Sequence, residues 1–316
     1  MPHVPLSRRA LLGVLGAGLL AGCASPSAGT RLRVATGGTR GVYFALGTAL
    51  AQAWHERLDL ATAPEVLATA GSVANLGLLS SGAADVAFSQ VDTVAERFDA
   101  TVPTGPLAPR ALARIYDDVV HVVVPAASPA TTVAGLRGAR VSVGAENSGV
   151  TVIARRLLDA AGLGPPDIRP VQLGINESVA ALREGVVDAF FWSGGLPTAG
   201  VRELAQTTPI RLLDLEDLLD AVQARFPEYS PGTVPAGAYD TAEPVTTLVV
   251  RNVLLVAAGM PDDLAEALVG TLFSEQARLA RASVAALTID TRSAIGTQPV
   301  PLHPGAERFY RAAKTG

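Results

Sequence analysis

The apolar and polar positions near the start of this chain change from one period to another across a short glycine-rich stretch. Residues 32–35 form an apolar-rich run that favours a strand. Residues 36–41, Thr-Gly-Gly-Thr-Arg-Gly, follow as a polar loop, and from Val42 to Trp54 the apolar residues recur at helical spacing. The pattern therefore predicts a strand that ends in a glycine loop, which opens directly onto the N-terminus of a helix.

The same pattern returns near the middle of the chain. Residues 140–143 are again strand-like, and residues 144–150 form a second polar loop with glycines. Apolar positions from 150 to 161 then fit a helix, with Gly162 as a suitable terminating residue. A second strand–loop–helix unit is therefore predicted.

Each unit is followed by another shared piece. A helix expected to be capped by Ser72 or by Ser178 ends at a glycine. A buried strand with the pattern G-x-x-D-x-x-F follows, at residues 82–88 and at residues 185–191. Two such units facing one another predict an α/β protein with two lobes and with helix N-termini along the cleft between them.

Helix N-termini in a cleft favour an anionic ligand, because their first N–H groups have no intrahelical acceptor and lie at the positive end of the helix dipole. Backbone N–H groups at Gly38 and Gly149 are candidates for this role. Arg40 is the only cation in the first loop. It either pairs with a ligand carboxylate or is a solvated loop charge.

Polar and aromatic residues near the predicted loops and strand ends complete the candidate site. For four of these residues a role other than ligand contact is open. Ser72 and Asp92 could cap a helix. Asn75 could face solvent, and Trp192 could pack in the core. The full set of expected ligand-binding residues is Gly38, Thr39, Arg40, Tyr43, Ser72, Asn75, Gln90, Asp92, Ser148, Gly149, Trp192 and Gly194.

Two longer apolar segments are expected to join the lobes. Residues 111–125 predict a pair of strands that leads into the second lobe, and residues 245–256 lead the chain back. The expected division is therefore 31–122 for the first part of lobe 1, 123–245 for lobe 2 and 246–316 for the rest of lobe 1. Phe190 and Phe191 are expected in the core, and the apolar spacing after Pro261 predicts a late amphipathic helix.

The first 22 residues predict an export signal rather than part of the fold. Arg8 and Arg9 precede an apolar run that is too short to span a membrane. The sequence Leu-Ala-Gly-Cys at residues 20–23 resembles a bacterial lipobox, and the pair of arginines resembles a twin-arginine signal. Cys23, the only cysteine, is the expected lipidation site, with residues 23–30 as a tether. The protein is then exported and held on the outer face of the membrane by its lipid alone.

Charge and missing motifs exclude several functional classes. Without residues 1–22 the chain has 23 basic and 29 acidic residues, a net charge of −6, and Lys314 is the sole lysine. No basic block indicates nucleic acid or an electrostatic membrane patch. His55, His121 and His303 show no metal-ligand spacing, so neither a metal nor a cofactor is expected. Nor is there a G-x-S-x-G or H-E-x-x-H motif, and we expect no enzyme.

Several of these segments together resemble the TAXI family, the TRAP-associated extracytoplasmic immunogenic solute receptors. The resemblance covers about residues 31–312 and is strongest at 37–51, 71–76, 90–92 and 191–197. It implies a type II periplasmic-binding-protein fold, with two α/β lobes joined by crossing hinge strands and a ligand cleft between them. It also implies capture of a small carboxylate such as glutamate, glutamine or a 2-oxo acid, and delivery to a TRAP membrane permease. A monomer is expected.

Two other functions remain open on the same fold. The chain is alternatively a binding protein for an ABC permease or for a sensor kinase. An enzyme on this fold is the least supported alternative, because a porphobilinogen-type transferase needs a cofactor-bearing cysteine in the body of the chain, which has none.

Overall fold

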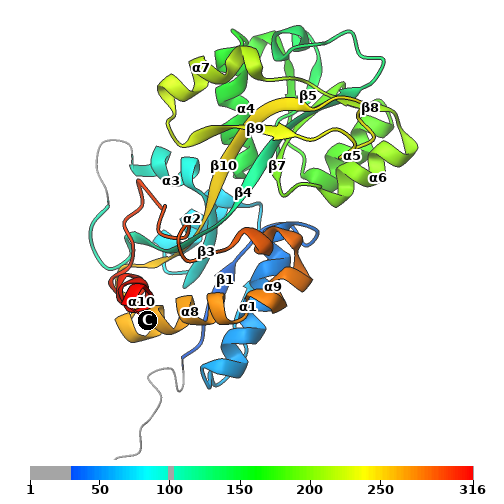
Figure 1. Cartoon of the computed structure of the whole chain (residues 1–316). Coiled ribbons are helices and arrows are strands. Elements are labelled where there is room, and N and C mark those ends of the chain that lie inside the picture. Colours follow the sequence, from blue (N-terminus) through cyan, green and yellow to red (C-terminus); the bar gives the residue numbers. More distant parts are fainter. Residues whose placement is uncertain (1–29, 99–102, 316) are drawn as a thin grey trace, which may run out of the picture.

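The computed structural model describes residues 30–98 and 103–315 as two α/β lobes with one sheet running through both (Figure 1). The strand order is β2-β1-β3-β10-β4-β7-β5-β6, with β8 paired to β4 and β9 to β10. The strands are β1 (Arg33–Ala35), β2 (Glu65–Leu67), β3 (Val86–Gln90), β4 (Pro109–Pro125), β5 (Arg140–Ser142), β6 (Arg169–Val171), β7 (Ala189–Gly194), β8 (Ile210–Leu212), β9 (Tyr229–Val234) and β10 (Val245–Ala257). The expected signal peptide, Cys23 and the tether up to residue 29 lie outside the described residues.

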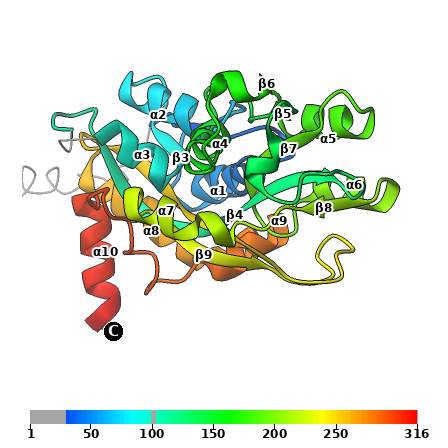
Figure 2. The ribbon, with the colours of Figure 1, turned by 90° about the horizontal axis from the view of Figure 1, so that it is seen from above.

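Helices lie on both sides of the strands when the molecule is seen from above (Figure 2). The α-helices are α1 (Val42–Arg57), α2 (Ser72–Ser80), α3 (Val91–Phe98), α4 (Gly149–Ala160), α5 (Ile175–Arg183), α6 (Ala199–Thr207), α7 (Glu216–Arg225), α8 (Asp262–Ser274), α9 (Gln276–Ala282) and α10 (Pro304–Thr315). Three short 3₁₀ helices are η1 (Val133–Leu136), η2 (Pro165–Asp167) and η3 (Val284–Thr288). No helix among the described residues combines the length and the apolar character needed to cross a membrane.

Two long antiparallel strands, β4 and β10, join the lobes (Figure 1). β10 pairs with β3 in lobe 1, and β4 pairs with β7 in lobe 2. The prediction of a strand pair at residues 111–125 is wrong, because this segment forms the single strand β4. An extended strand of 17 residues reaches across both lobes without a turn. The proposed lobe boundaries at 122/123 and 245/246 fall inside β4 and at the first residues of β10.

The predicted repeat of strand, loop and helix is confirmed. β1 leads into α1 and β5 leads into α4, while α2 and α5 each end at a glycine with positive φ, Gly82 and Gly185. The aspartate of each G-x-x-D-x-x-F motif accepts hydrogen bonds from the first residue of β1 or of β5, the first strand of its unit. Asp85 pairs with the backbone and side chain of Arg33, and Asp188 does the same with Arg140. The motif therefore fastens the carboxyl-terminal strand of each unit to its first strand.

The predicted serine caps of α2 and α5 are wrong. α2 is capped by Gly71, whose φ of 121° is costly for other residues, and no side chain caps it. Ser72 is the first helical residue, and its hydroxyl accepts from the backbone N–H of Gln90 instead. Ser178 lies inside α5, where its hydroxyl is buried against Ser142 Oγ at 2.8 Å. Both serine hydroxyls therefore form hydrogen bonds with neighbouring strands and do not cap their helices.

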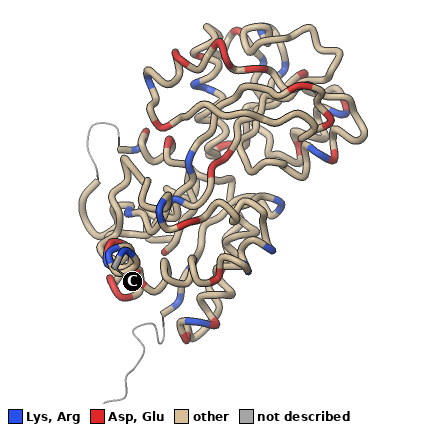
Figure 3. Tube along the Cα trace, in the orientation of Figure 1, with Lys and Arg blue, Asp and Glu red and all other residues tan. Residues whose placement is uncertain are grey.

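The core consists of apolar clusters on the two faces of the sheet. Phe190 and Phe191 are both fully buried and belong to different clusters, as expected for neighbours on a strand that point to opposite faces. The amphipathic helix predicted after Pro261 is α8, and its leucines at 264, 268 and 272 are buried in lobe 1. Basic and acidic residues are interleaved over both lobes (Figure 3).

Candidate functional site

A cavity of about 420 Å³ lies between the lobes, and five α-helices of the described residues begin at its wall. The first residue of each of these helices lines it: Val42 of α1, Ser72 of α2, Gly149 of α4, Ile175 of α5 and Ala199 of α6. Two of these helices belong to lobe 1 and three to lobe 2 (Figure 1). Because the first N–H groups of a helix lack intrahelical acceptors, both lobes present donors and a positive dipole end to the cavity.

The lobes touch one another directly, so the structure is a closed form. The backbone N–H of Ala74 in lobe 1 donates to the carbonyl of Asn147 in lobe 2 at 3.0 Å. Gln90 at the end of β3 donates to Ser193 Oγ of β7 at 2.7 Å. Gly149 lies so close to Gln90 that a Cβ atom at this position would overlap the Gln90 amide. Residues of both lobes therefore enclose the cavity.

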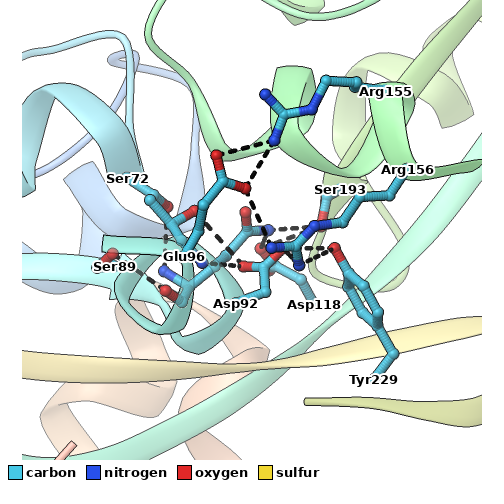
Figure 4. A network of polar contacts seen from close by, with 11 residues as sticks. Ser72, Ser89, Asp92, Glu96, Asp118, Arg155, Arg156, Ser193 and Tyr229 are labelled. Carbon is cyan, nitrogen blue, oxygen red and sulfur yellow. Dashed lines mark hydrogen bonds and ion pairs between the residues drawn. The ribbon is translucent and has the colours of Figure 1, made fainter. Parts of the chain in front are cut away.

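A buried polar network (Figure 4) includes the cavity-lining residues Ser72, Asp118 and Ser193. Gln90 Nε2 donates to Asp118 Oδ2 at 2.9 Å as well as to Ser193. Burial, before any other cause, raises the pKa of the Asp118 carboxyl from 3.8 to about 7, against the lowering effect of the Gln90 and Asn252 amides. Burial and the charge of Asp118 also raise the pKa of Tyr43, which keeps its hydroxyl protonated as a donor to Asn252 Oδ1.

Nine of the twelve predicted site residues line this cavity. They are Gly38, Arg40, Tyr43, Ser72, Gln90, Ser148, Gly149, Trp192 and Gly194. Trp192 is partly exposed at the end of β7, and its indole N–H donates to Thr198 Oγ1 at 2.9 Å. Ser148 caps α4 by accepting from the N–H of Thr151. That these nine residues contact a ligand stays a prediction.

The other three predicted residues do not line the cavity. Thr39 is exposed on the first loop. Asn75 is fully buried, and its amide donates to the carbonyls of Thr36 and Phe88, which ties α2 to β1 and β3. Asp92 is also fully buried, and its carboxylate accepts from the hydroxyl of Tyr229 at 2.6 Å.

Sequence analysis missed several residues that line the cavity. Asp118 and Tyr116 belong to the crossing strand β4, and Ser193 and Thr198 flank the loop after β7. A signal for Asp118 was present, because an acidic pair, Asp117-Asp118, interrupts an otherwise apolar strand. A charged residue in a strand that is buried on both faces requires a partner or a function.

Arg40 pairs with Glu203 of α6, so it joins the first loop of lobe 1 to lobe 2 beside the cavity. Its Nη2 lies 2.9 Å from Glu203 Oε2, and both side chains are more than half exposed. Neither of the two roles considered for Arg40 in the sequence, ligand contact or solvated charge, includes this ion pair. The ion pair links the two lobes in the closed form.

A double-mutant cycle tests the role of Arg40. We expect Arg40→Ala and Glu203→Ala each to weaken solute binding by no more than about fivefold, because exposed ion pairs contribute at most about 1 kcal/mol. The double variant should be no weaker than either single variant, since both remove one interaction. A loss with Arg40→Ala that far exceeds the loss with Glu203→Ala would assign Arg40 to the ligand instead.

The histidines and acidic residues give no sign of a metal centre. No group of three or more His, Cys, Asp or Glu side chains within 30–98 and 103–315 is placed to hold a metal ion. His121, in β4, contacts the Val119 carbonyl and the Tyr239 hydroxyl, both at 2.9 Å. Burial lowers the pKa of His121 to about 4, so the imidazole is neutral at physiological pH. These contacts give His121 a structural role between β4 and Tyr239.

Comparison with known proteins identifies the family. The sequence profile of the NMT1-like family matches residues 34–313. The chain belongs to the NMT1-like family. That match covers both lobes and all twelve predicted site residues. The narrower resemblance to TAXI receptors stays a prediction.

The NMT1-like chain is also similar to solved structures of binding proteins. One is an ancestral arginine-binding protein bound to arginine, with 14% identity, 80% of this chain and 96% of that chain covered, and a TM-score of 0.50. A periplasmic transporter matches with 18% identity, coverage of 92% and 94%, and a TM-score of 0.50. A putative L-cystine ABC transporter from Listeria monocytogenes matches with 12% identity, coverage of 80% and 94%, and a TM-score of 0.49. The two structures with a TM-score of 0.50 confirm the predicted two-lobed α/β fold of periplasmic binding proteins.

Proposed function

We propose that this chain is an extracytoplasmic solute-binding protein that captures a small carboxylate by closure of its two lobes. The observation that carries the proposal is the cavity between the lobes, where five α-helices of the described residues begin. Helix N-termini from both sides bind an anionic group in the closed form, and no covalent chemistry is needed for this. Hinge closure around a ligand is a common transition in periplasmic binding proteins.

The size and polarity of the cavity support a solute the size of an amino acid. About 420 Å³ lies at the lower end of the range for small-molecule sites. The ancestral arginine-binding protein, which shares the fold, is bound to an amino acid. Glutamate, glutamine and 2-oxo acids, which the TAXI resemblance implies, carry the carboxylate that the helix N-termini favour. These compounds are therefore the first candidates.

The partner we propose is a membrane permease. An ABC-type permease is the leading candidate, because the fold is that of periplasmic binding proteins in general and only the sequence resemblance supports the narrower TRAP assignment. The proposed lipid on Cys23 would hold the exported, monomeric protein beside that permease. Uptake by cells that express both components distinguishes the two classes, since an ABC permease depends on ATP and a TRAP permease on an ion gradient.

Calorimetric titration of the unliganded protein tests the proposed capture function. The panel should contain L-glutamate, L-glutamine, 2-oxoglutarate and glutarate, with arginine and cystine added because of the structural similarities. We expect at least one carboxylate to bind with micromolar or tighter affinity and to be recovered unchanged. Absence of binding by the whole panel, or chemical conversion of a bound compound, would overturn the proposal.

A further inference from the structure

Asp118 is the only acidic residue among the described residues that line the cavity. It lies in the crossing strand β4 opposite Val250 of β10, and it is 4% exposed. The only basic lining residue, Arg40, already pairs with Glu203. A buried carboxyl group facing a binding cavity without a cation is costly unless something neutralises it.

The polar network leaves atoms near Asp118 without hydrogen-bond partners. Asp118 Oδ2 accepts from Gln90 and, at 3.5 Å, from Ser193, while Oδ1 has no hydrogen-bond partner of normal geometry among the described residues, although the Asn252 amide and the Tyr116 hydroxyl lie near the carboxyl. Gln90 directs its Nε2 toward Asp118 and Ser193, which leaves its Oε1 without a donor. Asp118 lines the cavity, so its carboxyl group is part of the cavity wall, whereas Gln90 Oε1 lies against Gly149. Leaving a buried acceptor such as Asp118 Oδ1 unsatisfied is unfavourable, and a ligand with N–H donors would satisfy it.

The groups around Asp118 contain no cation that would stabilise its charged form. Its neighbours are Gln90 of β3, Asn252 of β10, Tyr43 of α1, Tyr116 of β4 and Ser193 of β7, with the charges of Asp92 and Asp117 also acting on it. The two aspartates and burial all raise the pKa of the carboxyl. A cation brought by a ligand would therefore be bound by a group that has no competing cation.

We propose that Asp118 binds the ammonium group of the solute, so that the cavity selects an α-amino acid over the corresponding 2-oxo acid or dicarboxylate. This inference rests on the proposed solute-binding function and narrows its ligand class. The solute carboxylate lies at the helix N-termini, and its ammonium group donates to Asp118. Both charges of a zwitterion are thus paired within the cavity.

An alternative use of the same carboxyl predicts the opposite dependence on pH. A protonated Asp118 would donate a hydrogen bond to an acceptor on a 2-oxo acid, and that complex would weaken as the pH rises through about 7. An ammonium group requires the ionised carboxylate, so its complex should strengthen over the same interval and release a proton. Binding measured between pH 5.5 and pH 8 separates the two.

The experiment compares L-glutamate and L-glutamine with 2-oxoglutarate and glutarate on the full chain and on two variants. Asp118→Asn removes the charge from the cavity, and Asp117→Asn is the matched control, because Asp117 pairs with Arg114 and does not line the cavity. We expect the wild type to prefer an amino acid, to bind it more tightly as the pH rises to 7 and to release a proton. In Asp118→Asn the amino acid should bind about 30-fold or more weakly, without that dependence on pH. Asp117→Asn should keep the wild-type preference for an amino acid, with its pH dependence moved to lower pH, because the charge of Asp117 raises the pKa of Asp118.

Each outcome decides the inference. Tighter binding of 2-oxoglutarate or glutarate than of the amino acids by the wild type overturns the inference and leaves the proposed function standing. The inference is also overturned, and the proposed function left standing, if Asp118→Asn unfolds at the wild-type temperature and still prefers the amino acid as the wild type does. Failure of all four probes to bind the wild type overturns the proposed function and the inference with it. If Asp118→Asn does not fold, the wild-type preference and its pH profile still decide the question.

Discussion

Replacement of Gly149 by valine is expected to weaken solute binding by about 100-fold while the unliganded protein remains folded. Gly149 is the first residue of α4 in lobe 2, and it faces lobe 1 across the closed cleft. A Cβ atom there would overlap Gln90 and lie 3.0 Å from Ser72 Oγ. Gln90 is held in place by Asp118 and Ser193, so it does not move aside without breaking those hydrogen bonds.

The expected size follows from the cost of closing over the added side chain. Overpacking of a tight interface costs about 1–3 kcal/mol, and the upper value corresponds to about 100-fold in affinity. The cost falls on the closed form alone, because separation of the lobes removes Gln90 and Ser72 from the neighbourhood of residue 149. The apparent affinity then falls with the population of the closed form.

Calorimetry with the best-binding solute and small-angle scattering with and without it check this prediction. Gly77→Val is the matched control, because Gly77 lies in α2 and a Cβ atom there meets nothing within 4 Å. We expect the control to bind like the wild type and to close on addition of solute. Wild-type affinity in Gly149→Val, or compaction by solute equal to that of the wild type, would contradict the closed form described here.

Local sequence patterns were sufficient for most of the architecture. The spacing of apolar residues and the position of glycines such as Gly82, Gly162 and Gly185 are set by short-range geometry, so they predicted the repeated units and their helix ends. Because parallel strands end at one edge of a sheet, residues following those strands were correctly expected near one another. For this reason nine of the twelve predicted residues line one cavity.

The predictions that failed depend on contacts between residues that are far apart in the sequence. Asn75 lies in the first turns of α2, as predicted. Its amide donates to the carbonyls of Thr36 and Phe88, which only the packing of β1 beside β3 brings together. Arg40 meets Glu203 across the two lobes, at a sequence separation of 163 residues. The crossing of the lobes by one continuous strand likewise depends on pairing with β10, more than 120 residues later. None of these contacts has a local signature.

Replacement of Arg156 by methionine is expected to destabilise the protein by about 3 kcal/mol at neutral pH. Arg156 of α4 is 6% exposed, and it pairs with Asp92 at 3.6 Å and with Glu96 at 3.1 Å, both on α3 of lobe 1 (Figure 4). Its guanidinium also lies 4.0 Å from the centroid of the Phe226 ring. Methionine keeps much of the packing but leaves Asp92 buried without a cation, and breaking a buried pair in this way costs about 3–5 kcal/mol.

The loss should depend on pH in a defined direction. Burial already raises the pKa of Asp92 in the wild type, although the Tyr229 hydroxyl and Arg156 act to lower it. Removal of Arg156 raises the folded-state pKa further, while the unfolded value stays near 3.8. A raised carboxyl pKa costs stability as the pH rises above the unfolded value. The variant and the wild type should therefore be closest in stability near pH 4 and furthest apart at neutral pH.

Chemical unfolding at pH 4 and at pH 7 measures the difference, with Arg155→Met as the matched control. Arg155 pairs with the same Glu96, but its side chain is 63% exposed, so its loss should cost less than about 1 kcal/mol. Adding Asp92→Asn to Arg156→Met should recover part of the stability, since it removes the unpaired charge. Equal losses for the two methionine variants at pH 7, or a loss for Arg156→Met that is the same at both pH values, would show that pairing of the buried Asp92 by Arg156 does not stabilise the fold.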